Sequence, residues 1–62
     1  MEELKDRVDA INTAQTELTT AQNILQSNPS LENQNLVYTA QNNLKNAEQN
    51  LINLKKIINK FL

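Results

Sequence analysis

Apolar and small residues recur along this chain at alternating spacings of three and four positions, which is the period of an amphipathic α-helix. In the first half the series runs Leu4, Ile11, Ala14, Leu18, Ala21 and Leu25. In the second half it runs Val37, Ala40, Leu44, Ala47, Leu51, Leu54, Ile58 and Phe61. The pattern predicts two helices, each with one apolar seam of the coiled-coil type.

The two series are separated by Ser27-Asn28-Pro29-Ser30, which holds the only proline of a chain without glycine. Pro29 disfavours helical geometry at Asn28 and suits the first turn of a following helix, which Asn28 is able to cap. We expect a helix over 2–26, a turn over 27–30 and a helix over 31–61. Because so short a connection makes helices antiparallel neighbours, the predicted fold class is all-α, a single-domain antiparallel two-helix hairpin.

Folding the chain about Pro29 places residue i roughly opposite residue 58 minus i. The central pairs are then Ala21 with Val37, Leu18 with Ala40, Ala14 with Leu44 and Ile11 with Ala47. Each layer sets a large side chain against a small one, so the backbones can approach closely and still fill the space between them. At the open end, Leu4 meets Leu54. There we expect Arg7 to cover Leu51 with its stem while its head reaches water.

Charge supports the same topology. The start of the chain carries Glu2, Glu3, Asp6 and Asp9, and its end carries Lys55, Lys56 and Lys60. An antiparallel hairpin brings these clusters side by side, and each lies at the helix end whose dipole favours its sign. The net charge of −1 gives no overall attraction to nucleic acid or anionic lipid.

A domain of 62 residues is short of core. It hides only about 60% of the surface that its unfolded chain exposes. Disulfides, structural metals and partner subunits are the usual supports of small scaffolds, but the chain has neither Cys nor His. We therefore expect a protein partner, either in a homodimer that forms a four-helix bundle or in a hetero-complex.

Apolar residues outside the seam are the candidate protein-binding residues. On a secondary face lie Val8, Ile24, Leu36 and Ile52, accompanied by Leu31 and Tyr38, with the amides Gln15, Gln22, Asn43 and Asn50 midway. Past the end of the first helix, the register leaves an overhang of Ile57, Ile58, Phe61 and Leu62. Such a surface is typical of a binding site, although isolated apolar groups on a surface are also normal.

No motif for catalysis, metal binding or cofactor binding is present. The N-terminal carboxylates lie on a solvated helix end, and Ser27 and Ser30 have no histidine to activate them. We expect no enzyme activity and no cofactor. The lack of cysteine fits a reducing compartment, and we expect a cytoplasmic protein.

A membrane partner is not expected either. No apolar run approaches the roughly 20 residues of a membrane span, and the acidic N-terminus does not resemble a signal peptide. The segment 51–62 has the composition of a basic amphipathic helix on a membrane surface. Its apolar side, however, continues the heptad frame of Leu44, and the hairpin brings its lysines beside the N-terminal acids.

Three segments carry a resemblance to a known family, namely Asn28-Pro29-Ser30, Asn46-Ala47 and Ile57-Ile58-Asn59-Lys60-Phe61. They resemble the turn and the C-terminal end of the needle subunits of type III secretion, whose small co-chaperones are hairpins of nearly this length. The second proline usual in the needle turn is replaced around Leu31-Glu32, and the distance from turn to C-terminus is shorter. The resemblance implies that the apolar C-terminal residues contact a neighbouring subunit or a chaperone.

In length, hairpin form and Ala/Leu seam the chain is also similar to Rop, a plasmid-encoded RNA-binding protein. RNA recognition by such a bundle calls for a basic face, often with aromatic residues. The lysines Lys5, Lys45, Lys55, Lys56 and Lys60 do not align along one stripe, so a nucleic-acid partner is not expected. A Rop-like RNA-binding regulator and a small inhibitor of the phage type stay open as alternative functions.

Overall fold

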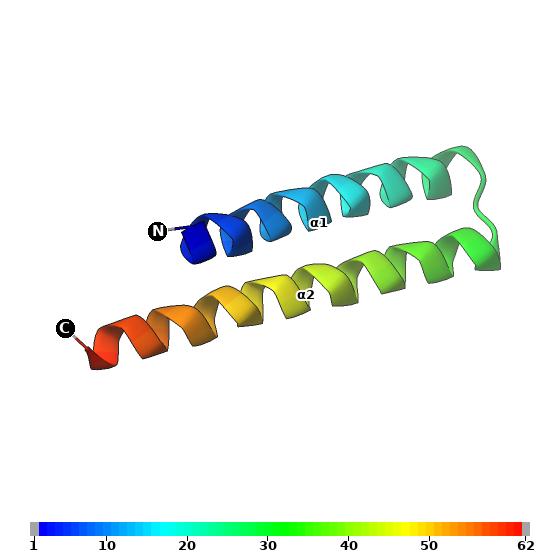
Figure 1. Ribbon diagram of the computed structural model, residues 1–62. Helices are drawn as coiled ribbons and strands as arrows, with labels where there is room; N and C mark the ends of the chain where they lie inside the picture. The colour runs from blue at the N-terminus through cyan, green and yellow to red at the C-terminus, as the bar shows by residue number, and fades with distance from the viewer. Residues whose placement is uncertain (1, 62) are drawn as a thin grey trace.

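Two helices pack against each other as an antiparallel hairpin in the computed structural model, which describes residues 2–61 (Figure 1). Helix α1 spans Glu2–Ser27 and helix α2 spans Leu31–Lys60. The molecule is a rod with extents of 49 × 16 × 10 Å, and both of its ends in sequence lie at the open end of the hairpin. The prediction of an all-α fold with two packed helices is confirmed; pairing into a four-helix bundle stays a prediction.

The helix boundaries lie within one residue of those expected from the sequence. α1 includes Ser27, after which the Asn28 N–H donates to the Ile24 carbonyl at 2.9 Å. α2 ends at Lys60, and the N–H of the capping residue Phe61 donates to the Ile58 carbonyl at 3.0 Å. Long helices are possible here because Pro29 is the only backbone breaker of the chain.

The prediction that Asn28 caps α2 is wrong, because Ser30 takes that position. Ser30 has extended backbone angles, φ −118° and ψ 161°, and its Oγ accepts a hydrogen bond from the Asn33 N–H at 3.1 Å. Pro29 therefore precedes the cap and does not open the helix. Asn28 stays with the end of α1 through its own N–H, while its carbonyl accepts from Asn33 Nδ2 at 2.7 Å.

The core follows the predicted seam. Buried residues are Ala14, Ala21, Val37, Ala40, Ala47 and Leu54. Half-buried apolar residues are Leu4, Ile11, Leu18, Leu25, Leu44, Leu51 and Ile58. Leu18 and Leu25 pack against the cluster of Ala21, Val37 and Ala40, so large side chains do lie against small ones. The core is thus a single strip along the line where the helices meet.

Phe61 continues the seam in sequence but not in space. It is 84% exposed, although it lies three residues after the half-buried Ile58. In the register of the hairpin, position 61 lies past Glu2, the first residue of α1. The seam therefore closes at Ile58.

Candidate protein-binding surface

Many of the larger apolar side chains of this protein lie outside its core. Four of the six buried residues are alanine, and within residues 3–61 no large side chain is fully enclosed. The exposed large apolar residues are Val8, Ile24, Leu31, Leu36, Tyr38, Ile52, Ile57 and Phe61. Two helices can each cover only one side of the other, which leaves both flanks of the seam open to water.

Helical geometry divides the exposed residues between two flanks. Successive residues are 100° apart around a helix, so a residue just before a seam residue lies on one side of the seam and a residue just after it lies on the other. Ile24, Leu36 and Ile57 directly precede Leu25, Val37 and Ile58. Tyr38 and Ile52 directly follow the seam residues Val37 and Leu51, Val8 follows the half-buried Arg7, and Leu31 follows the half-buried Ser30. We name these sides the groove flank and the opposite flank.

A shallow groove of about 340 Å³ lies on the groove flank near the turn. Its floor is formed by Ala21 and Ala40, and the apolar side chains beside them are Ile24 and Leu36. Polar positions complete the lining: Thr16, Glu17, Thr20, Thr39 and Asn43. The hollow exists because alanine at both seam positions leaves space that a longer side chain would fill.

The structure separates residues that the sequence placed on one secondary face. It brings Ile24 and Leu36 together in the groove. Val8 and Ile52 lie on the opposite flank, toward the open end. Of the predicted overhang, Ile57 and Phe61 are exposed, Ile58 is half-buried at its seam position, and Leu62 lies outside the described residues. The sequence contained the signal for two flanks, since it depends only on whether a residue precedes or follows a seam position.

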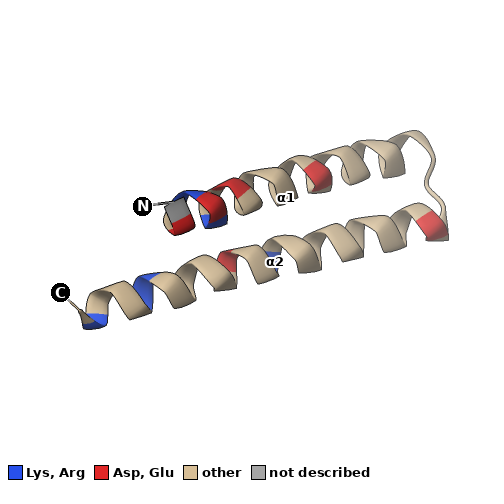
Figure 2. Cartoon of the chain, in the orientation of Figure 1, with Lys and Arg blue, Asp and Glu red and all other residues tan. Residues whose placement is uncertain are grey.

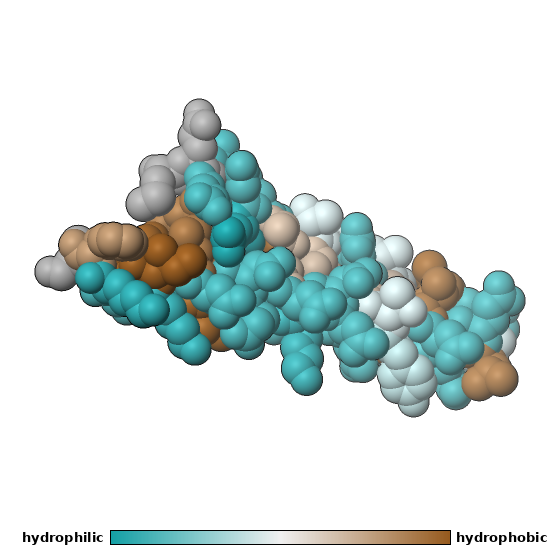
Figure 3. Space-filling model, turned by 60° about the horizontal axis from the view of Figure 1, so that its bottom comes forward, coloured by the Kyte–Doolittle hydropathy of each residue, from teal (hydrophilic) through white to brown (hydrophobic). Residues whose placement is uncertain are grey.

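Apolar side chains gather toward the two ends of the rod. Figure 3 shows hydrophobic atoms near the open end and near the turn, with mostly hydrophilic atoms between them on the face in view. The middle of the groove flank carries Asn43 and Asn50 from α2, and the middle of the opposite flank carries Gln15 and Gln22 from α1, all of them exposed. Each flank therefore offers apolar ends and an amide-rich middle to a partner.

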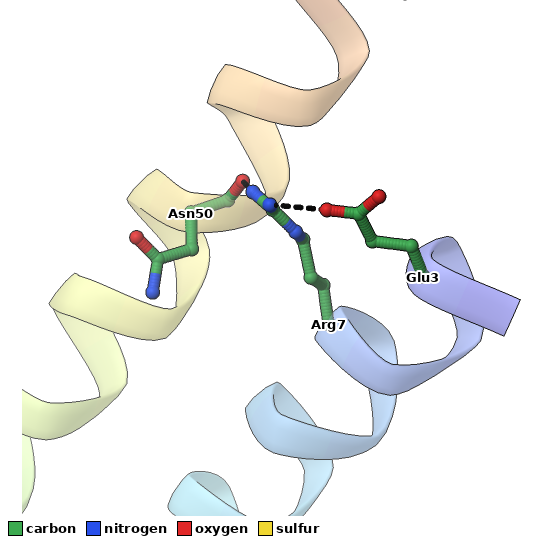
Figure 4. A network of polar contacts seen from close by, with 3 residues as sticks. All are labelled: Glu3, Arg7 and Asn50. Carbon is green, nitrogen blue, oxygen red and sulfur yellow. Dashed lines mark hydrogen bonds and ion pairs between the residues drawn. The ribbon is translucent and has the colours of Figure 1, made fainter.

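Arg7 links the two helices by a contact that the sequence did not reveal. Its Nη1 donates to the Asn50 carbonyl of α2 at 2.6 Å, and its Nη2 lies 2.7 Å from Glu3 Oε1 (Figure 4). The Arg7 side chain keeps 30% of its surface exposed, as expected of a head that reaches water, but the prediction missed its bond to the backbone of α2. This bond joins residues 7 and 50, close to the predicted register.

Opposite charges share the open end, but within residues 3–61 no acid of α1 forms an ion pair with a lysine of α2. Acidic residues lie along the start of α1 and lysines along the end of α2 (Figure 2). Within residues 3–61, however, the ion pair of the structure is Arg7–Glu3, which lies inside α1. The clusters act on each other through solvent, where charge interactions are weak and screened by salt.

Metal ligands and membrane-spanning helices are two further features of interest in residues 2–61. Among the described residues, no group of three or more potential metal-ligating side chains comes together. Between residues 2 and 61, neither helix combines the length and the apolarity needed to cross a membrane.

Comparison with known proteins adds no family to this picture. No family model, no curated protein and no solved structure matches the chain. The resemblances to type III secretion proteins and to Rop stay predictions, and the ground for a functional proposal is the surface described above.

Proposed function

We propose that this chain is a small non-enzymatic protein–protein interaction module, acting as an oligomer or as a subunit or co-chaperone of a larger assembly. One observation carries the proposal: the buried residues are mostly alanine, while most of the large aliphatic and aromatic side chains outside the seam face water. Covering apolar surface contributes roughly 25 cal/mol per Å², so a partner on either flank adds stability that the hairpin lacks by itself.

The shape of the surface indicates how a partner binds. A helix laid along the groove flank places an apolar side chain in the hollow between Ile24 and Leu36 and runs parallel to the hairpin. Two helices added in this way complete a four-helix bundle, whether they come from a second hairpin or from another protein. A cytoplasmic role in secretion or in phage assembly fits this mode of binding, and a phage-type inhibitor would use the same surface.

Substitutions on the flanks test the proposal. Affinity-tagged wild-type chain is expected to retain a defined set of partner chains, including copies of itself where it self-associates. Leu36→Asn and Ile52→Asn each remove an apolar side chain from one flank, so the chain with both changes is expected to lose those partners by about tenfold or more. Circular dichroism checks that the variant remains helical.

Asn42→Ser is the matched control, because Asn42 is exposed on α2 and belongs to neither seam nor groove. It is expected to retain the same partners as the wild type. The proposal fails if wild-type, control and doubly substituted chains retain identical sets of proteins, or if the wild type neither binds a partner nor self-associates.

A further inference from the structure

On the groove flank, α2 carries a stripe whose two halves mirror each other. The stripe consists of the residues that directly precede the seam positions of α2, and all of them are exposed. Its centre is Asn46. Moving outward in both directions, the matched positions are Asn43 and Asn50, Thr39 and Asn53, Leu36 and Ile57, and Glu32 and Lys60. An amide thus mirrors an amide at Asn43 and Asn50, a hydroxyl mirrors an amide at Thr39 and Asn53, and the outer pairs match aliphatic with aliphatic and acid with base.

We infer that the partner of the groove flank is a second copy of this chain, docked with its α2 antiparallel to α2 of the first. The inference rests on the proposed function and names its partner. With the two Asn46 residues together on a twofold axis, Leu36 of each copy meets Ile57 of the other. Glu32 of each copy then lies beside Lys60 of the other.

The pairing is specific to this register. A shift of one heptad sets Leu36 against Asn50 in one direction and Ile57 against Asn43 in the other. Either shift buries an aliphatic side chain against an amide and leaves one end of the stripe unpaired. An amide buried against an aliphatic side chain has no hydrogen-bonding partner there, which weakens the interface, so the unshifted arrangement is favoured.

The opposite flank of α2 is less complementary to a second copy. Its central residue is Lys45, so an antiparallel pair on that flank brings Lys45 against its own copy. On the same flank Tyr38 would meet Ile52, but Leu31 would meet Asn59 at the ends. The groove flank therefore suits a second copy better in this orientation, because it places no like charges at the axis and pairs an acid with a base at each end.

The groove offers a hollow in which a side chain of the second copy can pack. Leu36 is both a member of the stripe and a side of the groove, with Ile24 of α1 across from it. An antiparallel second copy brings its Ile57 to the mouth of this hollow, and the twofold axis repeats the contact at the other end. Side-chain amides near the axis can donate and accept at once, which fixes register at some cost in affinity.

Sedimentation equilibrium tests the self-association directly. For the wild type, the weight-average mass is expected to rise from 7.1 kDa toward twice that value between about 1 µM and about 1 mM. Ile57→Asn is expected to raise the dissociation constant about tenfold or more. Asn42→Ser is the control on the same helix, because Asn42 is exposed and faces away from both flanks, and it is expected to leave the constant within about twofold.

A charge exchange separates interface effects from folding effects. Glu32→Lys alone and Lys60→Glu alone each place like charges together at both ends of the homodimer, so each is expected to associate about threefold or more weakly. A mixture of the two variants restores an acid–base pair at each end and is expected to recover the wild-type constant. Damage to either fold would not be repaired by mixing.

A disulfide crosslink tests the twofold axis. The chain has no native cysteine, so a single introduced cysteine can bond only to the same position of a second copy. The Asn46→Cys chain is expected to form a disulfide-linked dimer on mild oxidation, and the Asn42→Cys chain, whose site faces away from both flanks, is not. A monomer throughout the concentration range, or equal crosslinking at both sites, overturns the inference. The proposed function would still be decided by the capture experiment with the flank variants, so the two failures are distinguishable.

Discussion

At the scale of single residues, alanine determines how closely the helices approach. Ala14, Ala21, Ala40 and Ala47 are all buried, and the cluster around Ala21 receives Leu18 from the same helix. This much followed from the sequence, because heptad spacing and the position of Pro29 together specify which residues face each other. The contact of Arg7 did not follow, since a bond from a side chain to a backbone carbonyl leaves no periodic signal.

Replacing Ala14 with leucine tests the close approach. Three extra carbon atoms at a buried seam position force the helices apart, so Ala14→Leu is expected to lower the free energy of unfolding by about 1–3 kcal/mol. Urea denaturation followed by circular dichroism measures this. Ala10→Leu is the matched control on the same helix, where the alanine is exposed, and is expected to change stability by less than about 0.5 kcal/mol. Equal costs at both positions would contradict the register.

Arg7 offers a second test at this scale. Lysine lacks the forked head that reaches Glu3 Oε1 and the Asn50 carbonyl together, so Arg7→Lys is expected to cost about 1 kcal/mol. Glu3→Gln removes the charge of the exposed ion pair but keeps the bond to α2, and its expected cost is below about 0.5 kcal/mol. A larger loss from Glu3→Gln than from Arg7→Lys in urea denaturation would show that the bond between the helices contributes little.

At the scale of elements, the helices were predictable and their junction was only partly so. A chain without glycine and with one proline has a single place to turn, and the boundaries at Ser27 and Leu31 agree with that. The cap was not resolved by the sequence, because Asn28 and Ser30 flank Pro29 and both have side chains that accept hydrogen bonds. The structure assigns the cap to Ser30, since the Asn28 N–H closes α1.

The cap assignment has a direct test. Ser30→Ala removes the acceptor for the Asn33 N–H and is expected to cost about 1 kcal/mol of stability. Asn28→Ala keeps the backbone carbonyl that bonds to Asn33 and is expected to cost less than about 0.5 kcal/mol. Thermal unfolding of both variants distinguishes the two. A greater loss from Asn28→Ala would return the cap to Asn28.

At the scale of the whole molecule, packing between the two helices accounts for the apolar residues of the seam. It does not account for the exposed apolar residues of the two flanks. The sequence indicated which apolar residues lie outside the seam, and the structure shows them exposed. It did not lead to their division into two flanks, because Val8, Ile24, Leu36 and Ile52 were treated as one face. The groove places Ile24 beside Leu36 and so identifies the flank to which Leu36 belongs. The mirrored stripe of α2 and its suitability for a second copy follow from that flank.

We propose that a single hairpin is short of core and that a partner completes it. The most direct measurement is the free energy of unfolding of the wild-type chain by urea at about 1 µM, where association is at its weakest. The expected value is below about 3–5 kcal/mol, the limit of what a single small core supplies, and it rises with protein concentration or with bound partner. A dilute monomer with full helicity and a concentration-independent free energy of unfolding well above about 5 kcal/mol would contradict the claim.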